Sequence, residues 1–469
     1  MNPIMNIKDN VLSSSAAEQF RQALHGYLVT RDDEAFEEAR QLYNGMIDKR
    51  PLLIAYCANV ADVVMAVKFA QKHSLLVAVR GGGHNGAGLG SCDDGLIIDL
   101  SRLNQVEVCP DNQTVRVGAG CASGDIDKAT HAHGLAVPLG IVASTGVAGL
   151  TLGGGHGYLT RKYGLTIDNL LEAQVVLADG RMVTASESEN SDLFWALRGG
   201  GGNFGIVTNF LFQAHPVSSV YGGPIFWRLA DSPAIMRAYR TFIGTAPHEL
   251  CTFFGLKVVP SVDPFPREIW GEKICALISC YTGTAEEGEK LLRPLRDALP
   301  EPIMDGMTMM PFPDLQSMFD PLLPAGLQWY WKGDFINELP DEAIDLHVQF
   351  AQNFPTDQSI MHLYPIDGAV HEVEAAATAW HQRDVTWSMV IAGISDNPTK
   401  ADALKQWGRD YWQAIHSHSA GSAYINFMME EGQARIKATY GANYERLATI
   451  KRKYDPTNFF RVNQNILPK

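Results

Sequence analysis

The segment Arg80-Gly81-Gly82-Gly83-His84 decides how we expect this chain to fold. Residues 75–79, directly before it, have the pattern of a short buried strand, and residues 61–73 carry apolar side chains at helical spacing. Consecutive glycines let backbone N–H groups approach an anion closely, which is one way that proteins hold phosphate or pyrophosphate. The pattern therefore predicts a helix and a strand that lead into a ligand-binding loop.

Two more glycine clusters follow, at residues 146–157 and 199–205. One cluster would be explained by tight turns, whereas three within one half of the chain favour a phosphorylated ligand. The run Gly200-x-Gly202-x-x-Gly205 matches the dinucleotide-binding pattern by letters only, because it follows a helical segment and precedes a strand, the reverse of the required order. The sequence also has no P-loop and no serine-hydrolase nucleophile elbow. None of these familiar motifs explains the glycines.

His84 ends the first glycine cluster, where its imidazole can approach whatever the loop holds. A neutral imidazole is a competent nucleophile near pH 7, and with the 8α-methyl group of a flavin it would form a histidyl-flavin. On the residues alone, a turn histidine bonded to backbone is the more common situation. His156, in the second cluster, is a weaker alternative for such a bond. His131 and His133 would point in different directions on a helix, so we interpret them as surface residues and not as a metal pair.

Short strand and helix patterns alternate through the rest of the first half. The turns Asp111-Asn112 and Asp179-Gly180 separate neighbouring strand patterns. Strand patterns occupy residues 95–100, 113–117, 173–177, 181–184 and 206–212, and helical patterns occupy residues 124–133 and 192–198.

The composition changes at about His215, where the glycine clusters stop and Trp, Met, Phe and Pro become frequent up to Met429. This shift predicts a second domain, an antiparallel sheet backed by helices. A chain of 469 residues exceeds what one hydrophobic core usually serves, which also favours two domains, or one domain with a large insertion. Strand patterns lie at residues 252–258, 274–281 and 388–392, and helical patterns at residues 285–299, 340–350 and 400–417.

Composition and charge limit the class of protein and of partner. Apolar residues make up 46% and charged residues 19%, which is typical of a globular enzyme and not of a disordered chain. The net charge of -14 disfavours nucleic acid and anionic membranes as partners, because both would repel the protein. The sequence has no apolar stretch long enough to span a membrane, and its first 20 residues lack the pattern of a signal peptide. We expect a cytoplasmic protein.

The seven cysteines are scattered and show no metal-type spacing. We interpret them as reduced, buried thiols and expect no metal site.

Five ordered stretches closely resemble the covalent-flavin oxidases related to berberine bridge enzyme and 6-hydroxy-D-nicotine oxidase, within the vanillyl-alcohol-oxidase superfamily. The resemblance covers most of the chain. The stretches are Val79-Arg80-Gly81-Gly82-Gly83-His84-Asn85, residues 153–164 (GGGHGYLTRKYG), Asp168-Asn169-Leu170, residues 197–208 (LRGGGGNFGIVT), and residues 453–460 (KYDPTNFF) with Asn463-Gln464-Asn465.

The resemblance implies an α+β, two-domain fold with a PCMH-type FAD-binding domain and an antiparallel-sheet substrate domain backed by helices. Residues 1–215 would bind FAD, residues 216–425 would cover the substrate, and residues 426–469 would return to the FAD-binding domain. His84 would be the covalent attachment point. The cofactor-binding residues implied are Arg80, Gly81, Gly82, Gly83, His84, Asn85, Gly146, Gly149, Gly153, Gly154, Gly157, Gly205, Ile206, Val207 and Asn463.

This chain departs from the family pattern at a second flavin link. Many relatives attach the flavin also through a cysteine a few residues before the second glycine cluster, where this chain has Val142. Cys121 lies too far upstream to inherit that role. We therefore predict a single covalent bond, as in the 6-hydroxynicotine oxidase branch.

The second departure concerns the catalytic base. Several relatives carry a catalytic tyrosine in a Tyr-x-Asn-Tyr motif, whereas this chain ends the motif with Phe427, which cannot take a proton. An uncharged amine substrate would also need no strong base, because it can lose hydride to a flavin directly. The candidates to replace the tyrosine are Tyr424, Glu430, Glu431, His362 and Tyr364.

The implied reaction is hydride removal from a C–H bond beside an amine, alcohol or activated aromatic carbon of a small organic substrate. Dioxygen would accept the electrons and give hydrogen peroxide. The alternatives are a dehydrogenase that uses another acceptor, and a catalytically silent flavin-binding protein. Aromatic residues that could enclose a flat substrate, or only pack a core, are Trp329, Tyr330, Trp331, Trp380, Trp387 and Phe427.

Overall fold

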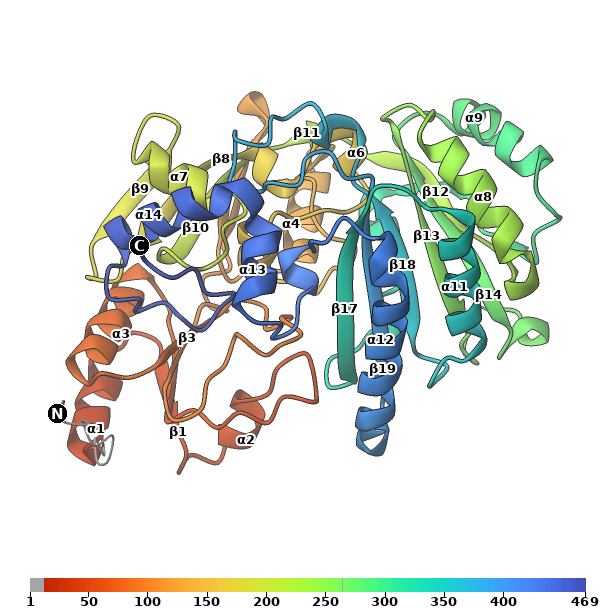
Figure 1. The fold of residues 1–469 in the computed structure, drawn as a ribbon. Coiled ribbons are helices and arrows are strands. Elements are labelled where there is room, and N and C mark those ends of the chain that lie inside the picture. The colour runs from red at the N-terminus through yellow and green to blue at the C-terminus, as the bar shows by residue number, and fades with distance from the viewer. Residues whose placement is uncertain (1–11, 264) are drawn as a thin grey trace.

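The computed structural model of the protein describes residues 12–263 and 265–469. The first 11 residues of the N-terminal stretch that we inspected for a signal peptide lie outside the described part. Figure 1 shows two bodies side by side, one built from the N-terminal half with the C-terminal tail and one built around a large sheet of the middle segment. Among the described residues, we find no helix with the length and apolar character that a membrane span requires.

The first body contains a four-stranded sheet that leads into the first glycine cluster. Strands β2 and β3 both pair in parallel with β4, and β3 ends at Arg80, directly before the glycines. Helix α3 (Val60–Lys72) precedes β3, and its first turn is capped by the side chain of Asn59, which accepts a hydrogen bond from the backbone of Asp62. In order across the sheet, the strands are β1 (Tyr27–Thr30), β2 (Leu53–Tyr56), β4 (Leu96–Asp99) and β3 (Val77–Arg80).

A second, antiparallel sheet lies in the same body. The strand patterns at residues 95–100 and 113–117 belong to different sheets, and the turn at Asp111-Asn112 instead joins β6 to β5, which the sequence pattern missed. In order, its strands are β5 (Val106–Cys109), β6 (Thr114–Gly118), β10 (Ile206–Gln213), β8 (Leu170–Val176) and β9 (Met182–Ser186). The helices of this part are α1 (Ser14–Ala23), α2 (Phe36–Ala39), α4 (Ser123–His131), α5 (Val147–Leu152), α6 (Thr160–Tyr163) and α7 (Ser191–Leu197).

The C-terminal tail packs into this first body. Helices α13 (Gln433–Tyr440) and α14 (Tyr444–Tyr454), blue in Figure 1, lie beside the N-terminal half, and their apolar side chains join the same core. Lys451 is fully buried there and donates hydrogen bonds to the carbonyl oxygen of Asn203 at 2.6 Å, to Asp455 at 2.7 Å and to the carbonyl oxygen of Phe460 at 2.8 Å. The tail therefore holds the third glycine cluster in place.

The second body is an antiparallel sheet of eight strands. Because side chains alternate along each strand, one face of the sheet packs on helices and the other faces the first body. Its strands are β15 (Met304–Asp305), β12 (Ser219–Arg228), β14 (Lys273–Tyr281), β13 (Leu250–Val258), β18 (Ile360–Pro365), β19 (Trp387–Ser395) and β17 (Gln328–Ile336) in order, with β16 (Thr308–Pro311) also on β12. The helices on the outer face are α8 (Ser232–Ile243), α9 (Ala285–Asp297), α11 (Asp341–Gln352) and α12 (Ala401–Ile415).

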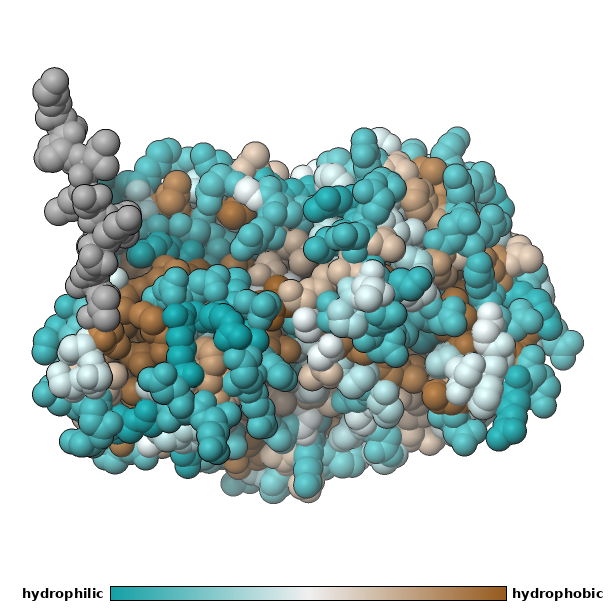
Figure 2. Space-filling model, turned by 90° about the horizontal axis from the view of Figure 1, so that it is seen from below, coloured by the Kyte–Doolittle hydropathy of each residue, from teal (hydrophilic) through white to brown (hydrophobic). Residues whose placement is uncertain are grey.

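Short elements complete the chain. Strands β7 (Leu135–Ala136) and β11 (His215–Pro216) form a separate pair, and helix α10 (Phe312–Ser317) contacts α4 across the two bodies. The molecular face in Figure 2 is mostly hydrophilic, with hydrophobic residues in separate patches.

Candidate active site

A cavity of about 340 Å³ lies between the glycine clusters of the first body and the inner face of the large sheet. Of the residues predicted to form the site, those that line it are Arg80, Gly81, Gly82, Gly83, His84, Asn85, Gly146, Gly149, Gly153, Gly205, Ile206, Val207, Asn463, His362, Tyr364 and Tyr424. The structure therefore brings together residues from distant parts of the chain.

Two kinds of glycine shape the cavity. Gly82 and Gly146 let the first two clusters touch, since a Cβ atom on Gly82 would lie 2.5 Å from the backbone nitrogen of Gly146. Gly149 and Gly202 instead face open space, and a Cβ atom on either would meet no protein atom within 4 Å. The first pair brings the loops together, and the second pair keeps room for a ligand against the backbone.

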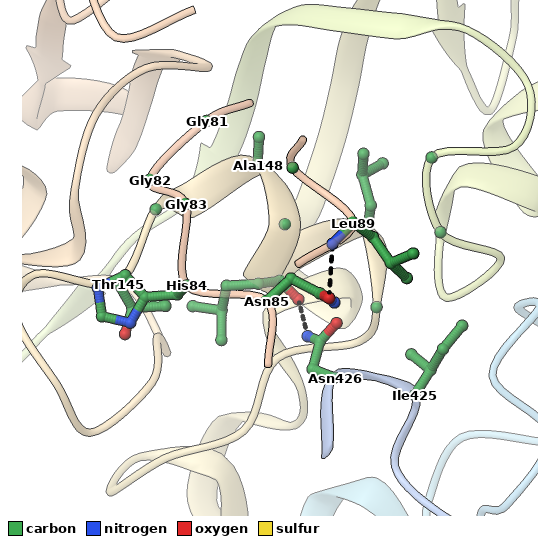
Figure 3. Close-up of a pocket in the computed structure, with 18 of the residues that line it drawn as sticks. Gly81, Gly82, Gly83, His84, Asn85, Leu89, Thr145, Ala148, Ile425 and Asn426 are labelled. Atoms are coloured by element: carbon green, nitrogen blue, oxygen red, sulfur yellow. Dashed lines mark hydrogen bonds between the residues drawn. The ribbon is translucent and has the colours of Figure 1, made fainter. Parts of the chain in front are cut away.

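His84 is held at the cavity wall. Its imidazole stacks on Tyr43, with ring centroids 3.9 Å apart, and its Nε2 lies 3.1 Å from Oγ of Ser144. Loss of hydration lowers the pKa of His84 to about 4, so the ring is neutral at physiological pH. Figure 3 shows His84 at the end of the glycine loop, on the same side as Thr145. The ring is thus oriented and uncharged, as a nucleophile requires.

The guanidinium of Arg80 is held by partners within the protein. It forms a buried ion pair with Asp99 and also donates hydrogen bonds to the carbonyl oxygen of Ala39 at 2.7 Å and to the hydroxyl of Tyr56 at 3.1 Å. These partners hold the end of β3, so the Arg80 charge is compensated within the protein.

The C-terminal tail closes one side of the cavity. Asn426 lies against Gly153 and donates hydrogen bonds to the carbonyl oxygen of Leu150 at 3.2 Å and to the hydroxyl of Tyr424 at 2.7 Å. The Tyr424 hydroxyl also accepts a hydrogen bond from the backbone N–H of Gly155 at 3.0 Å, and burial raises the pKa of Tyr424. Both partners of Tyr424 are therefore donors.

The opposite wall is the inner face of the large sheet. The strand register places Ile360, Ala392 and Trp331 in one row, and His362 and Val390 in the next row. Trp329 adds a second indole to this wall. The wall is therefore mainly apolar.

Three polar rings line the cavity here, His362 and Tyr364 from this wall and His156 from the second glycine cluster. Nδ1 of His362 lies 2.5 Å from the hydroxyl of Tyr364, and Nε2 of His156 lies 3.2 Å from Oγ of Ser388. Burial lowers the pKa of His156 to about 3, and burial with the charge of Lys257 lowers that of His362 to about 3. Burial raises the pKa of Tyr364. All three rings are therefore uncharged near neutral pH, and no aspartate or glutamate is among the described residues that line the cavity.

Comparison with known proteins identifies the family. A family profile described as "FAD binding domain" matches residues 51–186, and one described as "Berberine and berberine like" matches residues 423–467. An FAD-linked oxidoreductase of Dictyostelium discoideum is 32% identical over 459 residues, which cover 97% of this chain and 98% of that protein. The chain belongs to the berberine bridge enzyme-like FAD-linked oxidoreductases.

Solved structures of this family have the same fold. The 6-hydroxy-D-nicotine oxidase from Arthrobacter nicotinovorans superposes with a TM-score of 0.86 at 25% identity, covering 95% of this chain and 99% of that one. The carbohydrate oxidase from Microdochium nivale superposes with a TM-score of 0.85 at 24% identity, covering 97% of this chain and 100% of that one. The predicted family, the α+β fold and the assignment as an enzyme are confirmed. The two names differ in substrate, so the fold does not specify one.

The cavity of this family member fits FAD. The open space against Gly149 and Gly202 suits a ligand that approaches the backbone closely, and the wall beside it carries uncharged, partly apolar side chains suited to a flat ring. The side-chain oxygen of Asn463 is buried and has no hydrogen-bond partner among the described residues, while its amide nitrogen donates to the carbonyl oxygen of Gly202 at 3.1 Å. A bound cofactor can supply the missing donor.

Some predicted site residues lie away from the cavity. Gly154 packs under the ring of Trp380, Gly157 packs on the backbone of Leu139, and Glu430 is exposed. The side chain of Glu431 is only 5% exposed and pairs with Lys332 at 3.1 Å. These placements give none of the four a surface on the ligand space.

The aromatic residues singled out in the sequence fall into two groups, those that line the cavity and those that pack elsewhere. Trp329, Trp331 and Phe427 line the cavity, as the enclosing interpretation requires. Tyr330 and Trp387 point to the helix-covered face, and Trp380 lies in the core of the first body, as the packing interpretation requires. The sequence pattern missed Asn426 and Ser144 as site residues; alternation along a strand could not reveal them, because both lie outside strands.

Proposed function

We propose that this protein is an oxidase that holds FAD through a single covalent bond to His84. Its substrate is a small organic molecule that loses hydride from a C–H bond beside an amine, alcohol or activated aromatic carbon. Bound FAD supplies the hydride acceptor and passes the electrons to dioxygen, which becomes hydrogen peroxide. The observation that carries the proposal is the neutral, oriented imidazole of His84 beside the open glycine cradle.

One nitrogen of the His84 ring has a side-chain partner. Ser144 lies within hydrogen-bond distance of Nε2, so we propose Nδ1 as the nucleophile. With FAD bound, a bond between Nδ1 and the 8α carbon would release two protons and two electrons, which dioxygen would take up as hydrogen peroxide. A second link through cysteine has no nucleophile among the described lining residues, since Val142 lines the cavity and Cys121 is buried outside the lining.

The charge of the cavity restricts the substrate. A protonated amine is normally held by a carboxylate, and none is among the described lining residues. An amine would therefore bind uncharged, as an alcohol does. The apolar row of Ile360, Ala392 and Trp331 suits an apolar or aromatic body.

The proposal also assigns a role to each segment of the chain. Residues 1–215 with residues 426–469 hold the cofactor, and residues 216–425 cover the substrate. The shared core of the N-terminal half and the tail supports this division. We also propose a cytoplasmic location.

Acid denaturation tests the covalent bond. The wild-type chain should precipitate yellow, with an intact mass increased by one FAD. His84→Ala should give a white precipitate and a free chain mass, and Cys121→Ser should keep the full increase. Complete release of flavin from the wild type would refute the attachment, and a two-site crosslink map would refute the single bond.

Peroxide release tests the oxidase. Uncharged aromatic alcohols and amines, with sugars for comparison, should be screened for anaerobic bleaching of the flavin and for peroxide in air. Bleaching without peroxide would identify a dehydrogenase. No bleaching across the whole panel would favour a silent flavin-binding protein.

A further inference from the structure

An unpaired lysine lies beside the polar part of the cavity wall. Strand alternation puts Phe253, Gly255 and Lys257 of β13 on the inner face of the sheet. Among the described residues, none forms a hydrogen bond or an ion pair with the Lys257 ammonium, which is only partly exposed. Loss of hydration lowers the pKa of Lys257 to about 8. This lysine can therefore hold or release a proton near neutral pH.

His362 connects this lysine with the cavity. Its ring lies over Gly255, where a Cβ atom would be 3.0 Å from Cδ2 and 3.3 Å from Nε2. That edge of the ring thus points toward β13, the strand of Lys257, while Nδ1 points to the Tyr364 hydroxyl at 2.5 Å. Nε2 has no hydrogen-bond partner among the described residues, and the charge of Lys257 acts on the imidazole. The relay proposed below requires a water molecule between Nε2 and Nζ.

Lys257, His362 and Tyr364 form a series of polar groups, and Tyr364 is its last member toward the cavity. Its ring lines the cavity next to His156, with centroids 5.2 Å apart, and next to Phe427, with centroids 6.0 Å apart. The titratable groups that face the series are Lys257 from β13, His156 from the second glycine cluster, and the buried Tyr158, whose charge would act on Tyr364. A proton released in the cavity finds no carboxylate among the described lining residues.

We propose that Tyr364, His362 and Lys257 form a proton relay, in which Lys257 stores the substrate proton between the two halves of the catalytic cycle. The proposal rests on the proposed oxidase function. Oxidation of an alcohol to a carbonyl compound releases one hydride and one proton, and hydride, dioxygen and one proton give hydrogen peroxide. The same proton can therefore be taken up in the first half and returned in the second.

Each transfer in the relay breaks one bond and forms one. The substrate proton moves to the Tyr364 oxygen, and the hydroxyl proton of Tyr364 moves to Nδ1 of His362. The proton on Nε2 then moves through the bridging water to Nζ of Lys257, which becomes ammonium. His362 ends uncharged, so its low affinity for a second proton does not block the transfer. Lys257 is the net acceptor in those molecules in which its amine is uncharged at the start of the transfer.

Competitive labelling tests the lysine without any substrate. The FAD-loaded protein is treated with trace acetic anhydride between pH 6 and 11, and acetylation of Lys257 is measured by mass spectrometry against exposed Lys290. Lys257 should become reactive with a midpoint near pH 8. A midpoint at the ordinary lysine value of about 10.4 would overturn the proposal, because Lys257 could not then accept a proton near neutral pH.

Reoxidation tests the relay itself. Protein reduced with dithionite is mixed with oxygenated buffer at pH 6–10, and the return of flavin absorbance is timed. The wild-type rate should fall as pH rises through about 8, because Lys257 loses the proton that it must return. In Lys257→Met the rate at pH 7 should be lower by about 100-fold and should not change near pH 8.

Lys257→Arg separates proton transfer from simple charge. Arginine keeps the positive charge but does not release its proton. The relay predicts an Arg variant as slow as the Met variant, whereas wild-type rates in the Arg variant would overturn it. Lys290→Met is the control and should behave as wild type. If dioxygen reacts slowly in every variant, the oxidase proposal fails, and the same series with p-benzoquinone, which needs the same proton, still tests the relay.

Discussion

The substitution Gly149→Ala should slow the loading of the cofactor without lowering the stability of the fold. Gly149 lies inside α5 and lines the cavity, and an added Cβ atom would meet no protein atom within 4 Å. Alanine also favours a helix over glycine by about 0.5–1 kcal/mol. The flavin-free variant should therefore be slightly more stable than the flavin-free wild type.

The added Cβ atom should instead displace the bound cofactor. A Cβ atom projects about 1.5 Å from the backbone, and carbon atoms approach no closer than about 3.5 Å. A ligand packed against Gly149 must then move by about 1 Å, which can slow a positioned reaction by about 100-fold. We expect attachment of FAD at His84 to slow by about this factor, although His84 itself is unchanged.

The assay starts from flavin-free chain and adds FAD. Covalent loading is followed by intact mass, and the free energy of unfolding of the flavin-free chain by urea denaturation. Gly244→Ala is the matched control, because Gly244 has helical geometry outside the cavity and its added Cβ atom meets only ordinary contacts. Wild-type loading in Gly149→Ala would refute the reasoning, and so would a loading defect explained by a destabilised fold.

Two further predictions concern stability. Lys451→Met should lower the free energy of unfolding by about 3–5 kcal/mol, because it leaves the fully buried carboxylate of Asp455 unpaired; Lys453→Met, which removes an exposed pair, should change it by no more than about 1 kcal/mol. Acid should destabilise the fold through His156 and His347, whose pKa values burial lowers to about 3. Below pH 6.5 these histidines bind protons in the unfolded chain but stay uncharged in the folded chain. The free energy of unfolding should therefore fall by up to about 1.4 kcal/mol per pH unit for each histidine, down to about pH 3. Urea titrations from pH 6.5 to 4.5 should show a shallower fall in His156→Asn, and an unchanged slope would contradict this account.

The first half of the fold was predictable because its signals are local. Helix α3, strand β3 and the following glycines are contiguous, and each element matches its pattern within a few residues. Strand β12 was missed because Gly222, Gly223 and Pro224 lie in its centre, and such residues usually interrupt a strand. The structure tolerates them since Gly223 adopts a φ of 140° and a Cβ atom there would meet the backbone of Gly306. Gly223 within β12 is therefore explained by the neighbouring segment at Gly306, which a local sequence pattern does not reveal.

The site likewise contains features that the local sequence reveals and features that it does not. His84 is visible in the sequence because the loop that positions it is continuous with it. His362 and Tyr364 are two residues apart on one strand, so alternation alone puts them on one face. Their relation to Lys257 depends on the antiparallel pairing of β13 with β18, in which Gly255 lies opposite His362. A register between strands more than 100 residues apart is set by the whole sheet, and no local pattern encodes it.

Tyr424 is the strongest rival of Tyr364 as the group that first receives the substrate proton, and their partners distinguish them. The Tyr424 hydroxyl contacts the N–H of Gly155 and the amide N–H of Asn426, and neither group can accept a proton. A proton taken by Tyr424 therefore has no onward path, whereas Tyr364 adjoins a ring nitrogen that can pass one to β13. Tyr424→Phe should keep the fall in reoxidation rate near pH 8, and Tyr364→Phe should lose it. The opposite result would assign the proton to the tail of the chain and leave Lys257 without a catalytic task.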